Sequence, residues 1–193
     1  MANTSSKDWR TPTVVLVCGG IILTIAMGIR HGFGLFLQPI SHDMGWGRET
    51  FALAIAVQNL VWGATQPFAG MIADKYGTAR VVLTGMALYV LGLVAMANAQ
   101  TPAVFVLAGG LLIGTGLSGV TFSVISGVLG RKFPPEKRSM ALGISAAAAS
   151  FGQFAMLPLA QWLLSSVGWY GALLAMAGVA LLIAPLAAAM VER

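Results

Sequence analysis

Charged side chains are scarce in this sequence, because Asp, Glu, Lys and Arg make up only 9% of its 193 residues. An average soluble protein contains about 25% charged residues, which cover its water-facing surface. Cys18 is the single cysteine, so an internal disulfide bond is excluded. The sequence has two histidines, no metal-ligand spacing and no G-x-S-x-G motif. We therefore expect neither an enzyme nor a bound metal ion or cofactor.

Apolar residues are abundant instead, at 58% of the chain. A helix needs about 20 mostly apolar residues to cross a bilayer. Six segments reach that length: 13–37, 49–73, 80–98, 103–129, 139–164 and 169–190. We therefore predict an all-α membrane protein with a six-helix transmembrane bundle over residues 13–190. Residues 1–12 are expected to form a cytoplasmic tail, and residues 191–193 to begin the cytoplasmic middle loop.

Lysine and arginine residues concentrate on one side of these predicted spans. Nine of the eleven basic residues fall on the same side as the N-terminus, and one, Arg48, falls on the other side. The nine are Lys7, Arg10, Lys75, Arg80, Arg131, Lys132, Lys137, Arg138 and Arg193. Because cytoplasmic loops carry an excess of lysine and arginine, we predict that both termini are cytoplasmic. The same asymmetry explains the net charge of +5 without a nucleic-acid partner, and the expected surroundings are a lipid bilayer.

The eleventh basic residue, Arg30, lies inside the first predicted span, about 7 Å outward of its middle. A charge at a helix centre costs about 2.5–3.5 kcal/mol in a bilayer, so it indicates a functional site by default. The alternative is that the side chain extends to the outer headgroups and binds nothing. Because arginine stays charged and pairs with carboxylates, the expected ligand is an anion. His31 is adjacent but points about 100° away around a helix, so the two cannot face one cavity equally.

Other polar residues lie inside the predicted spans, and most are expected to bond to neighbouring helices. They are Gln58, Asn59, Gln66, Thr115, Ser118, Thr121, Ser123, Gln153 and Gln161. We select Gln58 and Gln153, together with Arg30 and His31, as the candidate substrate-binding residues. Residues 114–119 match the dinucleotide-binding pattern G-x-G-x-x-G. That pattern requires a preceding strand, whereas small residues inside an apolar span favour close helix packing.

The stretch GMIADKYGTAR, residues 70–80, places an acid and two bases between two apolar runs. Asp74 lies at the C-terminal end of a predicted helix, where the helix dipole disfavours an acid by a few tenths of a kcal/mol or more. We expect Lys75 and Arg80 to compensate this charge, because they are the nearest bases in the sequence.

The same stretch resembles the signature G-x-x-x-D-[RK]-x-G-[RK]-[RK] of the major facilitator superfamily, through Gly70, Asp74, Lys75 and Gly77. The two basic positions that should follow hold other residues, and Arg80 comes one place later. The resemblance implies that these five residues form a conformational switch. In the family, the acid of this loop meets a helix of the other half of the protein when the transporter faces outward.

Residues 28–46, GIRHGFGLFLQPISHDMGW, are similar to the first helix and outer loop of the monocarboxylate-porter branch, which includes oxalate/formate exchanger-like proteins. In that branch a basic residue in the first helix helps to bind the substrate carboxylate, and Arg30 occupies that place. The resemblance covers the whole chain and implies half of a major facilitator fold. That half consists of six transmembrane helices, as two inverted three-helix repeats.

The expected function that follows from this resemblance is the N-terminal half of a secondary transporter. It would move a small organic anion, a monocarboxylate, by alternating access. The expected partner is a second six-helix half, on the same chain or another, and the expected location is the bacterial inner (plasma) membrane. Two alternatives stay open: a non-transporting or truncated half-transporter that acts as a membrane interaction protein, and a homodimeric pore.

Overall fold

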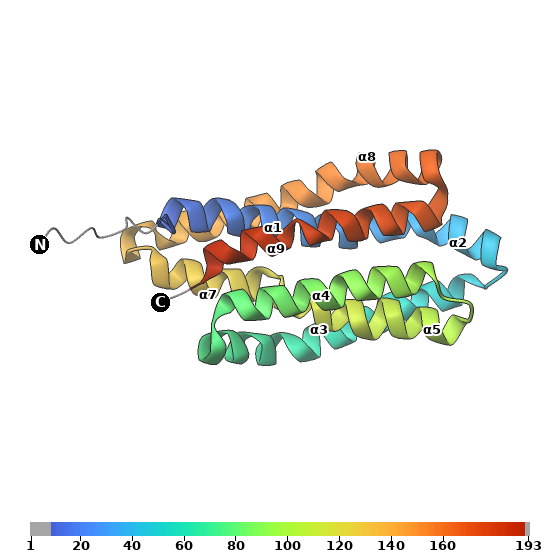
Figure 1. Cartoon of the computed structure of the whole chain (residues 1–193), viewed down its shortest axis with the longest axis horizontal. Helices are drawn as coiled ribbons and strands as arrows, with labels where there is room; N and C mark the ends of the chain where they lie inside the picture. Colours follow the sequence, from blue (N-terminus) through green and yellow to red (C-terminus); the bar gives the residue numbers. More distant parts are fainter. Residues whose placement is uncertain (1–8, 192–193) are drawn as a thin grey trace, which may run out of the picture.

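The computed structural model describes residues 9–191, and every regular element within them is helical. Long helices run side by side along one axis of the molecule (Figure 1). In chain order the elements are α1 Pro12–Gly32, η1 Phe33–Phe36, α2 Leu37–Met44, α3 Arg48–Tyr76, α4 Thr78–Ala97, α5 Pro102–Val106, η2 Leu107–Leu112, α6 Ile113–Gly119, α7 Phe122–Lys132, α8 Pro135–Leu181, α9 Ile183–Ala187 and η3 Ala188–Met190. The beginning of α1 and the end of the described chain lie at the same end of the bundle, on the left in Figure 1.

Two helices begin at a threonine that is followed by proline, a pattern that suits a helix N-terminus. The Thr11 hydroxyl accepts a hydrogen bond from the Val14 N–H at the start of α1. The Thr101 hydroxyl accepts the equivalent bond from the Val104 N–H at the start of α5, and both bonds measure 3.4 Å. The proline after each threonine occupies the first turn, where no helical partner exists for its missing N–H.

Three glycines with positive φ let the chain turn between helices. Gly45 ends α2 at φ 66°, and Gly77 joins α3 to α4 at φ 95°. Gly168, at φ 69°, divides α8 into two arms, residues 135–167 and 169–181. The first arm runs to the right end of Figure 1, where the chain turns and the second arm returns. Residues with a Cβ rarely adopt these φ values, so the backbone requires glycine at all three turns.

α1 packs closely on the first arm of α8 through small residues. A Cβ on Gly152 would collide with the Thr24 carbonyl oxygen, and a Cβ on Gly28 would collide with Met156. The Thr24 hydroxyl reinforces the contact by donating a hydrogen bond to Ala148 O at 2.8 Å. A larger residue at either glycine would therefore force the two helices apart.

The glycines of residues 114–119 also serve helix packing. A Cβ on Gly116 would lie 2.7 Å from the Tyr89 nitrogen and 2.8 Å from the Gly85 carbonyl oxygen on α4. A Cβ on Gly119 would lie 2.7 Å from Val81 O. These residues follow a helix and not a strand, so the prediction that this G-x-G-x-x-G pattern packs helices is confirmed.

Within residues 9–191, four helical segments are long and apolar enough to cross a membrane. They are Pro12–Met44, Thr78–Ala97, Pro102–Lys132 and Pro135–Met190, the last of which contains both arms of α8. Large apolar side chains also point outward, such as Leu60 at 73% and Phe154 at 74% exposed. These features indicate an integral membrane protein. α3 is not among the four segments, and six spans in two inverted repeats stay a prediction.

Candidate functional site

Arg30 lies in the last turn of α1 and is partly buried. Its Nη2 donates a hydrogen bond to Asn59 Oδ1 on α3. Its Cζ lies over the ring of Trp62, also on α3, at 4.7 Å from the ring centroid, which is cation–π geometry. We call Arg30, Asn59 and Trp62 the arginine cluster, because two helices meet here around one permanent charge.

α3 presents both partners on one face, because residues three positions apart are neighbours on a helix. Asn59 Nδ2 donates to Ile55 O at 2.9 Å, so the amide oxygen is left to accept from Arg30. Tyr89 of α4 is fully buried, and its hydroxyl donates to Ala26 O at 3.2 Å. This bond joins α4 to α1 one turn before Arg30. Three helices therefore position the guanidinium.

Two N–H groups of the arginine cluster are buried and have no hydrogen-bond acceptor among the described residues. They are Arg30 Nε and Trp62 Nε1. An unpaired buried donor costs about 1–3 kcal/mol, and more when it is charged. Both groups can only donate, and Arg30 forms no ion pair with any described residue. The chemical group that suits such a site is an anionic acceptor, for example a carboxylate.

The structure does not join the other predicted substrate-binding residues to this cluster. Gln58 is 1% exposed and its Nε2 donates to Gly109 O at 2.9 Å, within the π-helical turn η2, while its Oε1 has no partner among the described residues. His31 is exposed, and its Nδ1 donates to Met27 O of its own helix at 2.9 Å. Gln153 is partly buried on α8, and no hydrogen bond links it to residues 9–191. Their roles stay predictions.

The predicted switch loop lies where α3 meets α4, and its acid is paired with a distant base. Asp74 Oδ1 accepts a hydrogen bond from Arg131 Nη1 of α7 at 2.8 Å, and Arg131 Nη2 donates to Thr78 Oγ1 at 3.2 Å. The prediction that Lys75 and Arg80 compensate the charge of Asp74 is thus wrong, because Arg131 is the base that pairs with it. Lys75 Nζ instead lies 5.1 Å from the centroid of the Tyr76 ring.

The two glycines of this loop have different physical roles. Gly77 stands at φ 95°, a conformation that only glycine adopts readily. Gly70 is inside α3, and a Cβ there would meet nothing within 4 Å. The backbone conformation therefore requires glycine at position 77, whereas packing within the described residues does not require glycine at position 70.

Sequence reasoning missed Arg131 and Trp62, and in each case a weak signal existed. Arg131 is a basic residue in the last turn of its helix, on the side of the bundle where Asp74 also lies. Trp62 stands three positions after Asn59, a spacing that puts an aromatic ring and an amide on one helix face. Neither sequence feature indicates which helix the residue contacts. The pairs Arg131–Asp74 and Trp62–Arg30 could therefore be identified only from the tertiary structure.

Comparisons with known proteins agree with this architecture. The family model of the Major Facilitator Superfamily matches residues 16–193. Monocarboxylate transporter 13 of Rattus norvegicus is 30% identical over 159 residues, which make up 81% of this chain and 36% of the relative. The oxalate:formate antiporter of Oxalobacter formigenes is 26% identical over 154 residues, which make up 79% of this chain and 36% of the antiporter.

The same fold is found among solved structures of transporters. The xylose transporter XylE from E. coli, in an inward-open conformation, matches with a TM-score of 0.73 at 14% sequence identity. The match covers 94% of this chain and 48% of the xylose transporter. The chain thus spans about a third of the length of the curated relatives that it matches, and about half of this solved structure.

Proposed function

The chain belongs to the major facilitator superfamily, and we propose that it forms the N-terminal half of a secondary transporter for a small organic anion, a monocarboxylate. The proposal includes alternating access, in which two halves of a transporter rock around a central site. Relatives named as monocarboxylate transporters and as an oxalate:formate antiporter support the substrate class. The fold match to a sugar transporter at 14% identity supports the architecture alone.

The observation that carries the substrate class is the pair of unpaired donors at Arg30 Nε and Trp62 Nε1. A carboxylate has about four acceptor positions on two oxygens, so it can accept from both N–H groups together. The guanidinium also matches a carboxylate in shape and charge. A neutral sugar hydroxyl would supply acceptors without neutralising the charge, and an uncompensated cation is costly in the membrane.

The proposed fold has six transmembrane helices, in which α3 and the two arms of α8 each count as a span. α3 is polar, but its polar side chains have partners on the helices around it. Gln58 Nε2 donates to Gly109 O, and Gln66 Nε2 donates to Ser123 Oγ at 3.1 Å. Polar groups that bond between helices are tolerated inside a bilayer. The proposed arrangement is two inverted three-helix repeats in the bacterial inner membrane, with both termini cytoplasmic.

The proposed assembly includes a second six-helix half, either elsewhere in the same polypeptide or on another chain. The solved transporter that shares the fold is about twice as long as the region matched here, since 48% of it is covered. Exposed apolar residues on α3 and α8, such as Leu60 and Phe154, provide surface for that half and for lipid. The central site would then lie between the two halves, beside the arginine cluster.

The loop between α3 and α4 is proposed to act as the conformational switch of this transporter. Asp74 and Arg131 form an ion pair whose side chains are 68% and 44% exposed, respectively. Exposed ion pairs contribute about 0–1 kcal/mol, so a competing partner on the second half could replace Arg131 at low cost. A pair that exchanges easily suits a contact that forms in one state of the transport cycle and opens in another.

The experiment that tests this function is transport by the chain assembled with its second half in liposomes. We expect accumulation of a labelled monocarboxylate such as formate or lactate, and none of a neutral solute of similar size such as glycerol. Arg30→Gln should abolish the accumulation at equal protein levels. Transport of the neutral solute in preference to the anions would contradict the proposed substrate class.

A further inference from the structure

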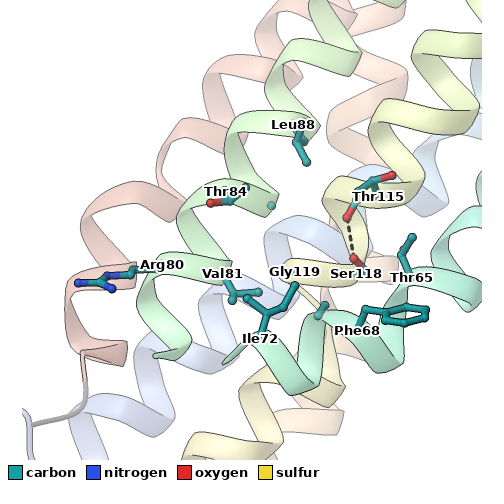
Figure 2. Close-up of a pocket in the computed structure, with 12 residues that line it drawn as sticks. Thr65, Phe68, Ile72, Arg80, Val81, Thr84, Leu88, Thr115, Ser118 and Gly119 are labelled. Carbon is teal, nitrogen blue, oxygen red and sulfur yellow. Dashed lines mark hydrogen bonds between the residues drawn. The ribbon is translucent and has the colours of Figure 1, made fainter. Parts of the chain in front are cut away.

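A groove runs between α3 and α4 on the outside of the bundle, with α6 as its floor (Figure 2). It encloses a cavity of about 360 Å³. Its walls include Phe68 and Ile72 from α3 and Leu88 from α4, and Ser118 lies in its floor. The Ser118 hydroxyl donates to Thr115 O at 2.7 Å within its own helix, so this polar group is already satisfied. The groove therefore suits an apolar occupant.

The groove opens outward. Phe68 is 59% exposed and Ile72 is 48% exposed, although both line the cavity. The floor lies deep because α4 and α6 approach closely, with Gly85 against Gly119. In a bilayer this cavity would face the acyl chains of the surrounding lipids.

The end of the groove is basic. Arg80 lines this cavity and also lines an adjoining cavity of about 250 Å³, together with Lys75 and Gly77. Figure 2 shows the guanidinium of Arg80 directed away from the apolar walls, so that only the stem of the side chain borders them. Among the described residues neither Arg80 nor Lys75 forms a hydrogen bond or an ion pair, and Lys75 Nζ lies over the Tyr76 ring.

The start of α4 adds positive potential at the same place. α4 begins at Thr78 after Gly77, which supplies no side-chain hydrogen bond to cap the helix. The first N–H groups of a helix lack helical partners and carry partial positive charge. Two cationic side chains and one uncapped helix N-terminus thus surround the end of an apolar groove.

We propose that this groove binds one anionic phospholipid, with an acyl chain between α3 and α4 and the headgroup phosphate at Arg80 and Lys75. The occupant must be an amphiphile, because the apolar cavity and the basic cavity share Arg80. It must be anionic, because the two bases have no acid partner among the described residues. The loop between α3 and α4 lies at an end of the bundle, where lipid headgroups of a bilayer reside (Figure 1). This inference does not depend on the transported substrate.

The test compares lipid binding to the purified chain by native mass spectrometry. The probes are phosphatidylglycerol and phosphatidylcholine with identical acyl chains, and we expect stronger retention of phosphatidylglycerol. Removing both bases, by Lys75→Gln with Arg80→Gln, should weaken phosphatidylglycerol binding about thirtyfold. Each base near an anionic lipid surface strengthens binding about fivefold, and the two effects multiply. The matched control is Lys137→Gln with Arg138→Gln, two exposed bases at the start of α8, which should leave binding unchanged.

Equal binding by the two double variants, or equal retention of the two lipids, would overturn the proposal. A second measurement uses phosphatidylglycerol with a photoreactive acyl chain, which should label α3 and α4 around Phe68 and Leu88. Thr84→Trp should reduce this labelling, because Thr84 lines the groove and a larger side chain would fill it. Labelling elsewhere on the chain would exclude the groove as the acyl site. Competition by free glycerol 3-phosphate would show a soluble-phosphate site and would equally overturn the lipid assignment.

Discussion

Replacing Arg30 with glutamine should weaken the binding of a short monocarboxylate by about 10²–10⁴-fold. Each hydrogen bond to a charged group contributes about 1.5–3 kcal/mol, and a carboxylate can accept two from one guanidinium. Losing both bonds costs about 3–6 kcal/mol, which corresponds to that change in Kd. The site leaves guanidinium donors for a carboxylate, because Asn59 accepts from one of the five N–H groups of Arg30 and Nε has no acceptor among the described residues.

Two further variants distinguish how much the charge of Arg30, its paired N–H groups and the indole N–H of Trp62 each contribute to carboxylate binding. Arg30→Lys keeps the charge but loses the paired N–H groups, so it should retain part of the affinity. Trp62→Phe keeps an aromatic ring beneath the cation, which now lies 4.7 Å from the ring centroid, but removes the Nε1 donor. It should weaken binding by about tenfold if that donor bonds the carboxylate.

The assay is calorimetric titration of formate or lactate into the assembled transporter in lipid nanodiscs, at equal amounts of folded protein. An arginine that only extends to the outer headgroups predicts unchanged affinity in all three variants. Affinities within twofold of the wild type for Arg30→Gln would therefore refute the site, together with the anionic substrate. Membrane insertion serves as the control, since removing a charge from a span should leave it unchanged or improve it.

Three other predictions follow from the loop, the backbone and the topology. Asp74→Asn should shift the balance between inward-facing and outward-facing states, which is measured by the accessibility of the cavity. It should lower the free energy of unfolding by less than about 1 kcal/mol. Unchanged accessibility would contradict the proposed switch. Gly77→Ala should destabilise the fold by about 1–3 kcal/mol in thermal unfolding, because φ is 95° there, whereas Gly70→Ala should be neutral. An impermeant thiol reagent should label Ser166→Cys but not Glu136→Cys in intact cells, and the reverse pattern would invert the predicted orientation.

Local features of the sequence were sufficient for much of the helical layout. The predicted span 80–98 overlaps α4, which runs from Thr78 to Ala97. The predicted break between 164 and 169 contains Gly168, whose φ of 69° turns the chain back. Both features depend on neighbouring residues alone, namely a continuous apolar run and a glycine with positive φ. Sequence patterns of this kind report local structure well.

Pairings between distant helices were not accessible in the same way. Lys75 and Arg80 are the bases near Asp74 in the sequence, but the partner of Asp74 is Arg131, 57 positions away. The depth of Arg30 in its predicted span is visible in the sequence, and its functional role stays a prediction. Its contacts with Asn59 and Trp62 depend on how α1 rotates against α3. Rotation about a helix axis is decided by packing, for example where Gly28 and Gly152 let α1 approach α8.

α3 is not among the segments apolar enough to cross a membrane, although it supplies both partners of Arg30. Its polar residues have specific partners: Asn59 accepts from Arg30, Gln58 donates to Gly109 O, and Gln66 donates to Ser123. Asp74 extends the same pattern to the end of the helix, about 22 Å from Asn59 at 1.5 Å per residue, where it pairs with Arg131. A helix that supplies hydrogen bonds to three neighbours must carry polar side chains, and each one lowers its mean hydropathy. The cost of these groups in a bilayer is offset only if their partners stay in place, so the proposed membrane span α3 can carry polar side chains because neighbouring helices supply hydrogen-bond partners for them.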